Sequence, residues 1–321
     1  MKIHATALKL EATEKLKCLS CKPKKLTLIH AAVVAAVTVI ASLMNIFLNG
    51  QVAQSGGLDG MQIKALWETT GSVMELAQTF LLPFWNVGIF YVALRFARGQ
   101  NAETRDLLGG FHRLGKVLSM LLWQFLLYFG AVLAVMYIGS TLVTLFADLD
   151  TLTAALGPYA QMLQEDMTLL EDPDFLRSLP LAQVLSAFIV PLLISLVIAV
   201  FVLGFLSYRL RLCNYFIMDT PEMGGLSAIR QSFRCMKGNI WAMIKLDLSF
   251  WWYYALQFVL LLISVLATVL ILLDLPELGE LGSIAMQFAY CAGYLVLVYF
   301  KGAHVNTTYA LAYESLKIKT L

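Results

Sequence analysis

Side chains that could hold an anionic group are concentrated in the stretch 208–247. Two carboxylates, Asp219 and Glu222, precede the bases Arg230, Arg234 and Lys237. Guanidinium and ammonium groups bind phosphate oxygens through charge-assisted hydrogen bonds, so one interpretation is a site for a lipid headgroup or phosphate. The candidate residues for a lipid-headgroup or structural motif are Arg209, Arg211, Asp219, Pro221, Arg230, Arg234, Lys237, Gly238 and Asp247.

The same stretch also has a purely structural interpretation. Asp219 or Thr220 would cap the start of a helix that has Pro221 in its first turn. The three bases that follow would lie about one turn apart on one helix face, opposite lipid phosphates. The sequence leaves both interpretations open, and the structural one is the more ordinary.

Asp247 stands alone as an acid at the edge of a hydrophobic segment. Ionisable groups inside a bilayer mark ion or proton routes, so one interpretation makes Asp247 a gate or relay. The alternative, which we favour, is an ion pair with a nearby base such as Lys245 or Arg211. Such a pair would anchor the adjoining basic helix to the membrane helices.

The sequence predicts no catalytic, cofactor-binding or metal-binding residues. It contains no P-loop, no H-E-x-x-H and no G-x-S-x-G. Cys18 and Cys21 form a C-x-x-C, but a structural zinc site needs four ligands and no other Cys or His stands at the required spacing. We therefore expect a protein that is not an enzyme and that needs no cofactor.

Composition assigns the chain to the membrane proteins. Of its 321 residues 60% are hydrophobic and 14% charged, against about 45–50% and about 25% in soluble domains. This excludes a disordered chain, a soluble nucleic-acid-binding protein and a secreted disulfide scaffold. Six segments are long and apolar enough to cross a bilayer. They are 26–48, 79–94, 117–146, 181–207, 246–273 and 281–300.

The charges alternate in sign between the connecting segments. All Lys and Arg except Lys64 and Arg177 lie before the first segment, after the sixth, or in the connections 95–116 and 208–245. Loop 147–180 on the opposite side is acidic. The positive-inside rule therefore predicts six spans with both termini in the cytoplasm.

Basic, amphipathic runs precede the first, third and fifth segments. These runs are 12–17, 107–116 and 228–238, and we expect helices that rest on the anionic inner leaflet. Their similarity is compatible with a threefold repeat or with the layout alone. In loop 147–180 helical spacing of apolar residues predicts two short helices separated at Gly157-Pro158. That loop is either an extracellular binding surface or a pair of interfacial helices.

Several runs of the sequence resemble one known family. They are Arg95-Phe96-Ala97-Arg98-Gly99, Ile217-Met218-Asp219-Thr220-Pro221, Ala228-Ile229-Arg230-Gln231-Ser232, Met236-Lys237-Gly238-Asn239, Leu246-Asp247-Leu248-Ser249-Phe250 and Ala310-Leu311-Ala312-Tyr313-Glu314. The chain resembles the bacterial integral membrane family catalogued as domain of unknown function 975. It departs from that pattern at Trp251-Trp252-Tyr253, where the family has I-G-W. The resemblance implies a membrane fold and no assigned activity.

These observations predict an all-α, polytopic membrane helix bundle. Residues 1–25 would be a cytoplasmic basic segment and residues 26–321 a single membrane domain in the bacterial cytoplasmic membrane. We expect a non-enzymatic accessory or interaction protein of the envelope whose partners are the anionic inner leaflet and a membrane protein, not nucleic acid. The alternative is a passive or exchange transporter of a small apolar or amphipathic solute.

Overall fold

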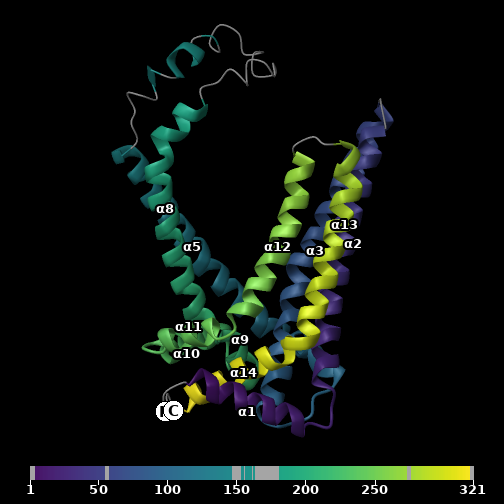
Figure 1. The fold of residues 1–321 in the computed structure, drawn as a ribbon, viewed down its shortest axis with the longest axis vertical. Helices are drawn as coiled ribbons and strands as arrows, with labels where there is room; N and C mark the ends of the chain where they lie inside the picture. Colours follow the sequence, from purple (N-terminus) through teal and green to yellow (C-terminus); the bar gives the residue numbers. More distant parts are fainter. Residues whose placement is uncertain are drawn as a thin grey trace. The chain divides into compact units, whose positions relative to one another are not determined.

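The computed structural model describes residues 4–54, 58–146, 153–154, 156–160, 162, 181–272 and 276–318. Within these ranges all regular elements are helices (Figure 1). The all-α prediction is therefore confirmed. The chain divides into two compact units, which are described separately. Unit 1 comprises Met1–Leu121 and Arg211–Leu321, and unit 2 comprises Leu122–Leu210.

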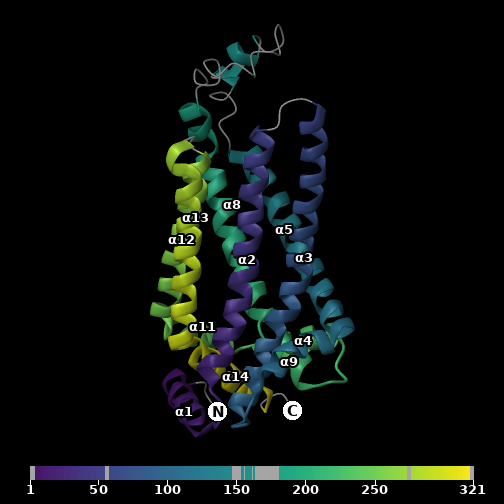
Figure 2. The same cartoon turned by 90° about the vertical axis from the view of Figure 1, so that its right-hand side faces the viewer.

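Four long helices form the apolar part of unit 1. They are α2 (Pro23–Gln54), α3 (Leu58–Ala97), α12 (Trp251–Leu272) and α13 (Pro276–Leu297). Helix α12 packs on α13, α13 on α2, and α2 on α3, so the four run side by side (Figures 1 and 2). Helices suit apolar surroundings because their backbone hydrogen bonds are satisfied within the segment.

Shorter helices gather at one end of these four and form what we call the polar end layer. Its members are α1 (Ala5–Cys18), η1 (Thr104–Leu108), α4 (Gly109–His112), α9 (Cys213–Asp219), α10 (Gly225–Met236) and α14 (Ala303–Lys317). Helix α14 contacts α1 and α3, and α9 contacts α3 and α10. The first and last helices of the chain therefore meet at this end (Figure 2).

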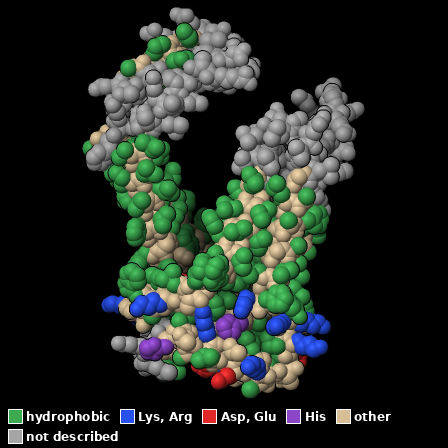
Figure 3. Space-filling view, viewed as in Figure 1, with side chains coloured by type: hydrophobic (Ala, Val, Ile, Leu, Met, Phe, Trp, Pro, Cys, Tyr) green, Lys and Arg blue, Asp and Glu red, His purple; other side chains and the backbone are tan. Residues whose placement is uncertain are grey.

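The best-packed core of unit 1 lies in and beside this layer. Tyr313, Phe96, Leu107, Met236 and Leu316 are among the largest side chains that are fully buried. By contrast, apolar side chains remain on the surface of α12 and α13, with Lys and Arg at the end of the helices (Figure 3). This distribution is typical of a membrane protein, whose apolar surface faces lipid.

Two glycines allow the polar end layer to approach α3 closely. A Cβ on Gly88 in α3 would collide with the carbonyl oxygen of Leu107 in η1. A Cβ on Gly110 in α4 would likewise collide with the carbonyl oxygen of Phe84. Because only glycine lacks that atom, both contacts depend on it. These contacts hold the connection after α3 against the helix that precedes it.

The described residues contain five helical stretches that are long and apolar enough to cross a membrane, and a bent helix pair that makes a sixth if counted as one span. The predicted segments 26–48 and 79–94 lie inside α2 and α3. Segments 117–146 and 181–207 lie inside α5 (Leu114–Phe146) and α8 (Leu181–Leu210). Segment 281–300 continues from α13 into a π-helical turn, η3 (Val298–Gly302).

The predicted span 246–273 coincides with α12 over most of its length but is bent near its start. The chain bends by 72° between α11 (Ile240–Leu248) and α12, so residues 246–248 belong to a differently directed helix. Ser249 Oγ donates a hydrogen bond to the carbonyl oxygen of Leu246 at 2.6 Å, an interaction by which serine competes with helix continuation. Phe250 is buried beside the bend and lies under the ammonium group of Lys9, 4.0 Å from its ring centre.

Unit 2 contains the greater part of α5 together with α8. A Cβ on Gly139 would lie 3.2 Å from Ser195 Oγ, so small residues form the contact between these helices, as is common in membranes. Phe125, Tyr137 and Phe201 are exposed on their outer faces. Unit 2 therefore has the apolar exterior expected of lipid-facing helices.

Most of loop 147–180 lies outside the described residues. Residues 156–160 are helical, so the chain does not break at Gly157-Pro158 itself. The remainder of the two predicted helices lies outside the described residues.

Candidate functional site

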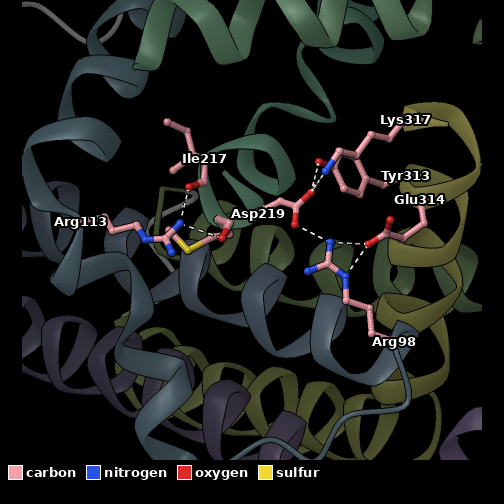
Figure 4. A network of polar contacts seen from close by, with 8 residues as sticks. Arg98, Arg113, Ile217, Asp219, Tyr313, Glu314 and Lys317 are labelled. Carbon is pink, nitrogen blue, oxygen red and sulfur yellow. Dashed lines mark hydrogen bonds and ion pairs between the residues drawn. The ribbon is translucent and has the colours of Figure 1, made fainter. Parts of the chain in front are cut away.

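Asp219 is the most strongly coordinated acid in the described part of the chain. It is the last residue of α9, and its side chain is 4% exposed. The Tyr313 hydroxyl donates a hydrogen bond to Oδ2 at 2.8 Å, and Lys317 Nζ lies 2.5 Å from the same oxygen. Arg98 donates to the other carboxylate oxygen, Oδ1 (Figure 4). One carboxylate thus collects donors from two distant parts of the chain.

Arg98 extends this arrangement to a second acid. Its Nε donates to Glu314 Oε1 at 2.7 Å. Arg98 directly follows α3, where Gly99 adopts φ +69° and closes the helix with hydrogen bonds from Gly99 N to Phe96 O and from Gln100 N to Arg95 O. This C-terminal motif directs the chain away and fixes the arginine beside α14. We call Arg98, Asp219, Tyr313, Glu314 and Lys317 the Asp219 cluster.

The interpretation of Asp219-Thr220-Pro221 as a helix start is wrong. Asp219 ends α9, Thr220 is its C-cap, and α10 begins only at Gly225. The carboxylate is occupied by side chains from α14 and the end of α3, so it does not cap a following helix. Pro221 directly after the C-cap is instead a common stop signal.

Arg113 also binds the C-terminal end of α9. Its Nη1 donates to the carbonyl oxygens of Ile217 at 2.6 Å and Met218 at 2.7 Å (Figure 4). Lys116 Nζ donates to the carbonyl oxygen of Pro221. Cations at a helix C-terminus satisfy carbonyl groups that lack intrahelical partners and complement the helix dipole. The α9 terminus is therefore held by both side-chain and backbone contacts.

Electrostatics keep Asp219 ionised. Burial alone would raise the pKa of its carboxyl, but hydrogen bonds from Lys317, Arg98 and Tyr313 outweigh it and lower that pKa below its ordinary value. A carboxylate that is ionised at neutral pH and hydrogen-bonded through both oxygens is a poor general acid or base at that pH. The chemistry of this cluster is therefore that of a structural ion pair.

A second ion pair involves Asp247, as expected from the sequence. Arg211 Nη1 lies 2.5 Å from Asp247 Oδ2, and Tyr309 donates to Oδ1 of the same carboxylate. The Tyr254 and Tyr309 hydroxyls are 2.6 Å apart, and the Arg211 guanidinium lies 4.3 Å from the Tyr309 ring centre. Of the two bases predicted, Arg211 is the partner. Asp247 thus joins α11 to Tyr309 of α14 and to Arg211, which lies two residues before α9.

The other predicted site residues do not join these clusters. Arg230 and Arg234 are exposed on α10, while the opposite face of that helix, including Ile229, is buried. Lys237 is the C-cap, and Gly238 ends the helix with φ +79°. Two members of the predicted set lie elsewhere in the chain. Pro221 is exposed in the turn before α10, and Arg209 in unit 2 lies over the Phe205 ring at 5.0 Å.

Sequence reasoning missed the α14 contribution. Tyr309, Tyr313 and Lys317 recur every four residues, so they lie on one helix face. This spacing predicts that the three side chains share a helix face, but it does not indicate which acids that face contacts. Arg95 and Asp106 were also missed as a pair, with Nη1 and Oδ2 2.5 Å apart.

Helix α1 is held by protein contacts. Lys15 Nζ donates to the carbonyl oxygen of Ala97 at 2.5 Å, and Lys9 Nζ donates to that of Ser249. The His304 ring nitrogen Nε2 lies 3.1 Å from the Lys9 carbonyl oxygen. The basic N-terminal segment is thus docked on unit 1 rather than held by lipid contact alone.

No group of three or more His, Cys, Asp or Glu suited to a metal ion occurs among the described residues. Cys18 is exposed, whereas Cys213, Cys235 and Cys291 are buried.

Comparison of the chain with known proteins identifies its family. No curated protein and no solved structure matches the chain. A family model described as "Protein of unknown function (DUF975)" matches residues 1–319, nearly the entire chain. The runs around Arg98, Asp219, Asp247 and Glu314, which form the ion pairs of the polar end layer, are those that resemble the family. The chain therefore belongs to the DUF975 family.

Proposed function

We propose that this chain is a non-enzymatic accessory or interaction protein of the bacterial envelope. It crosses the cytoplasmic membrane six times, with both termini in the cytoplasm. Residues 1–25 are a cytoplasmic basic segment, and residues 26–321 form a single membrane domain. The polar end layer then faces the cytoplasm and the anionic inner leaflet.

The orientation is supported by the distribution of charge. All but two of the 23 Lys and Arg occur in the segments that this topology assigns to the cytoplasm. Cytoplasmic connections of membrane proteins carry such an excess. The meeting of α1 and α14 at one end of unit 1 is consistent with termini on one side.

The single observation that carries the non-enzymatic proposal is the coordination of Asp219. A catalytic carboxyl needs a pKa near the working pH and access to substrate. Asp219 has neither, because its side chain is 4% exposed and its pKa is lowered by three donors. Asp247 and Glu314 are likewise engaged by Arg211 and Arg98. These acids therefore serve to join helices.

The outer face of α10 supports a role in interaction. Arg230 and Arg234 point away from the buried side of the helix. An exposed basic face next to a membrane attracts anionic lipid and acidic protein segments.

Site-specific photocrosslinking in growing cells tests the proposal. A photoreactive residue in place of Arg230 is expected to give a discrete protein adduct, whereas the same residue in place of the buried Ile229 gives none. Turnover of a lipid or peptide by the purified protein would contradict the non-enzymatic assignment. Saturable solute flux in liposomes that is abolished by blocking Cys291 would instead favour a transporter.

A further inference from the structure

A basic pocket of about 740 Å³ opens in unit 1 where the polar end layer meets the apolar helices. It is bounded by the C-terminal part of α1, the first turn of α2 and the π-helical turn η3. No Asp or Glu lines it. Its five lysines are Lys17, Lys22, Lys24, Lys25 and Lys301.

The lysines of the basic pocket carry charge that the described part of the chain does not neutralise. All five are exposed. The ion pairs formed by described residues involve Lys15, Lys317 and several arginines, but none of these five. Burial, and to a smaller extent repulsion by Lys301, lower the pKa of the neighbouring Lys9. An anion bound here would relieve this repulsion.

Aromatic side chains form the side of the pocket nearest to the apolar helices. Tyr299 and Phe300 both come from η3 and are exposed. Lys24 Nζ lies 5.6 Å from the Tyr299 ring centre. Exposed aromatic residues beside lysines are typical of the level at which lipid headgroups lie. The π-helical turn places Tyr299, Phe300 and Lys301 together, and such turns are frequent at functional sites.

We propose that the basic pocket binds the headgroup of an anionic phospholipid. The five ammonium groups would surround the phosphate, and the acyl chains would lie along α2 and α13, which begin and end beside the pocket. A lipid fits better than a free phosphate, because Pro23 in the pocket wall opens a candidate membrane span and the neighbouring exposed side chains are apolar. The inference rests on the proposed cytoplasmic orientation of the polar end layer, where anionic lipid is available.

The test uses the full chain purified in a zwitterionic detergent. Binding of phosphatidylglycerol, phosphatidylcholine and glycerol 3-phosphate is measured for the wild type and two double variants. One variant, K24Q/K301Q, removes two charges from the pocket. The matched control, R105Q/K245Q, removes two exposed charges that lie outside the pocket and outside the basic face of α10. Thermal unfolding of both variants verifies that they are folded.

We expect the pocket variant to bind phosphatidylglycerol at least about tenfold more weakly than the wild type, because each lysine near a headgroup contributes substantially. The control should keep wild-type affinity, and phosphatidylcholine should bind weakly to all three proteins. Equal weakening in the pocket variant and the control would overturn the proposal, since it would indicate nonspecific charge attraction. Glycerol 3-phosphate binding as tightly as the lipid would also overturn it in favour of a free phosphate ligand.

This result does not depend on the orientation or on a protein partner, because it is measured in detergent. Failure of the proposed function would show as a missing crosslinked partner, whereas failure of the pocket would show as unchanged lipid affinity.

Discussion

Asp219 and Asp247 each join helices that are far apart in the sequence. Asp219 connects α9 to α14 and to the end of α3, and Asp247 connects α11 to Arg211 and α14. Removing one partner of a largely buried ion pair leaves the remaining charge uncompensated. The resulting loss of stability exceeds the stability that the intact pair contributes. We therefore expect both acids to stabilise the fold.

Replacing Asp219 with Asn is expected to lower the free energy of unfolding by about 2–3 kcal/mol, because hydrogen bonds to a charged acceptor are lost. Lys317 and Arg98 would lose their shared acceptor. The measurement is thermal unfolding in detergent. Arg230→Gln on the exposed face of α10 is the control and should unfold like the wild type. Equal stability of the Asp219→Asn variant and the control would refute the structural role of the cluster.

The same carboxylate predicts acid sensitivity. Its pKa in the folded protein lies below the ordinary value, which is about 3.9 in an unfolded chain. Its contribution is complete above the unfolded pKa and is lost as the pH falls through the folded pKa. The unfolding temperature of the wild type should therefore drop between about pH 5 and pH 2, and that of Asp219→Asn should drop less. Parallel curves for the two proteins would contradict this assignment.

Sequence reasoning found the acids but not all their partners. The sequence predicts an ion pair of Asp247 with Lys245 or Arg211, and the partner is Arg211, the more distant of the two in the sequence. Asp219 was assigned to a helix start, since local signals predict local contacts. Its actual donors, Arg98 and Tyr313, lie about a hundred residues away on either side, and one sequence does not indicate which distant segments meet.

Close contacts between helix backbones, and not apolar surface alone, position the polar end layer on α3. Gly110 and Gly88 permit α4 and η1 to contact the helix backbone directly. Added volume at such a contact forces a shift of the backbone, because the colliding atom belongs to the main chain.

Replacing Gly110 with Ala should destabilise the protein by about 1–3 kcal/mol, because the new methyl group collides with the Phe84 carbonyl. Gly115→Ala is the matched control, because Gly115 is an exposed helical glycine with open space around its Cα. That variant should be stabilised by about 0.5–1 kcal/mol, since Ala favours the helix more than Gly does. Unfolding temperatures in detergent measure both effects, and a change of the same sign in both variants would argue against the close approach.

Helix positions were predictable from the sequence, whereas their directions were not. Long apolar runs located α2, α3, α5 and α8, because a bilayer span requires such runs. The sequence does not predict the bend between α11 and α12, because residues 246–273 form one hydrophobic run in which Asp247 is the only charged residue. At the bend, Ser249 Oγ donates to the carbonyl oxygen of Leu246 and Phe250 is buried beside Lys9.

For the molecule as a whole, we propose that the polar end layer faces the cytoplasm. The proposed interaction role and the lipid pocket both depend on this, because anionic lipid and the positive-inside bias belong to the cytoplasmic side. Net charge alone is +2 and carries no such information. The information lies in which segments hold the bases.

Sided labelling of native cysteines tests this claim most directly. Cys18 is exposed at the end of α1, and Cys21 follows in the connection to α2, while the other three cysteines are buried. A membrane-impermeant maleimide should leave the protein unlabelled in intact spheroplasts and label it in inside-out vesicles. The double variant C18S/C21S should remain unlabelled in both. Labelling of Cys18 or Cys21 in intact spheroplasts would contradict the cytoplasmic placement of the polar end layer.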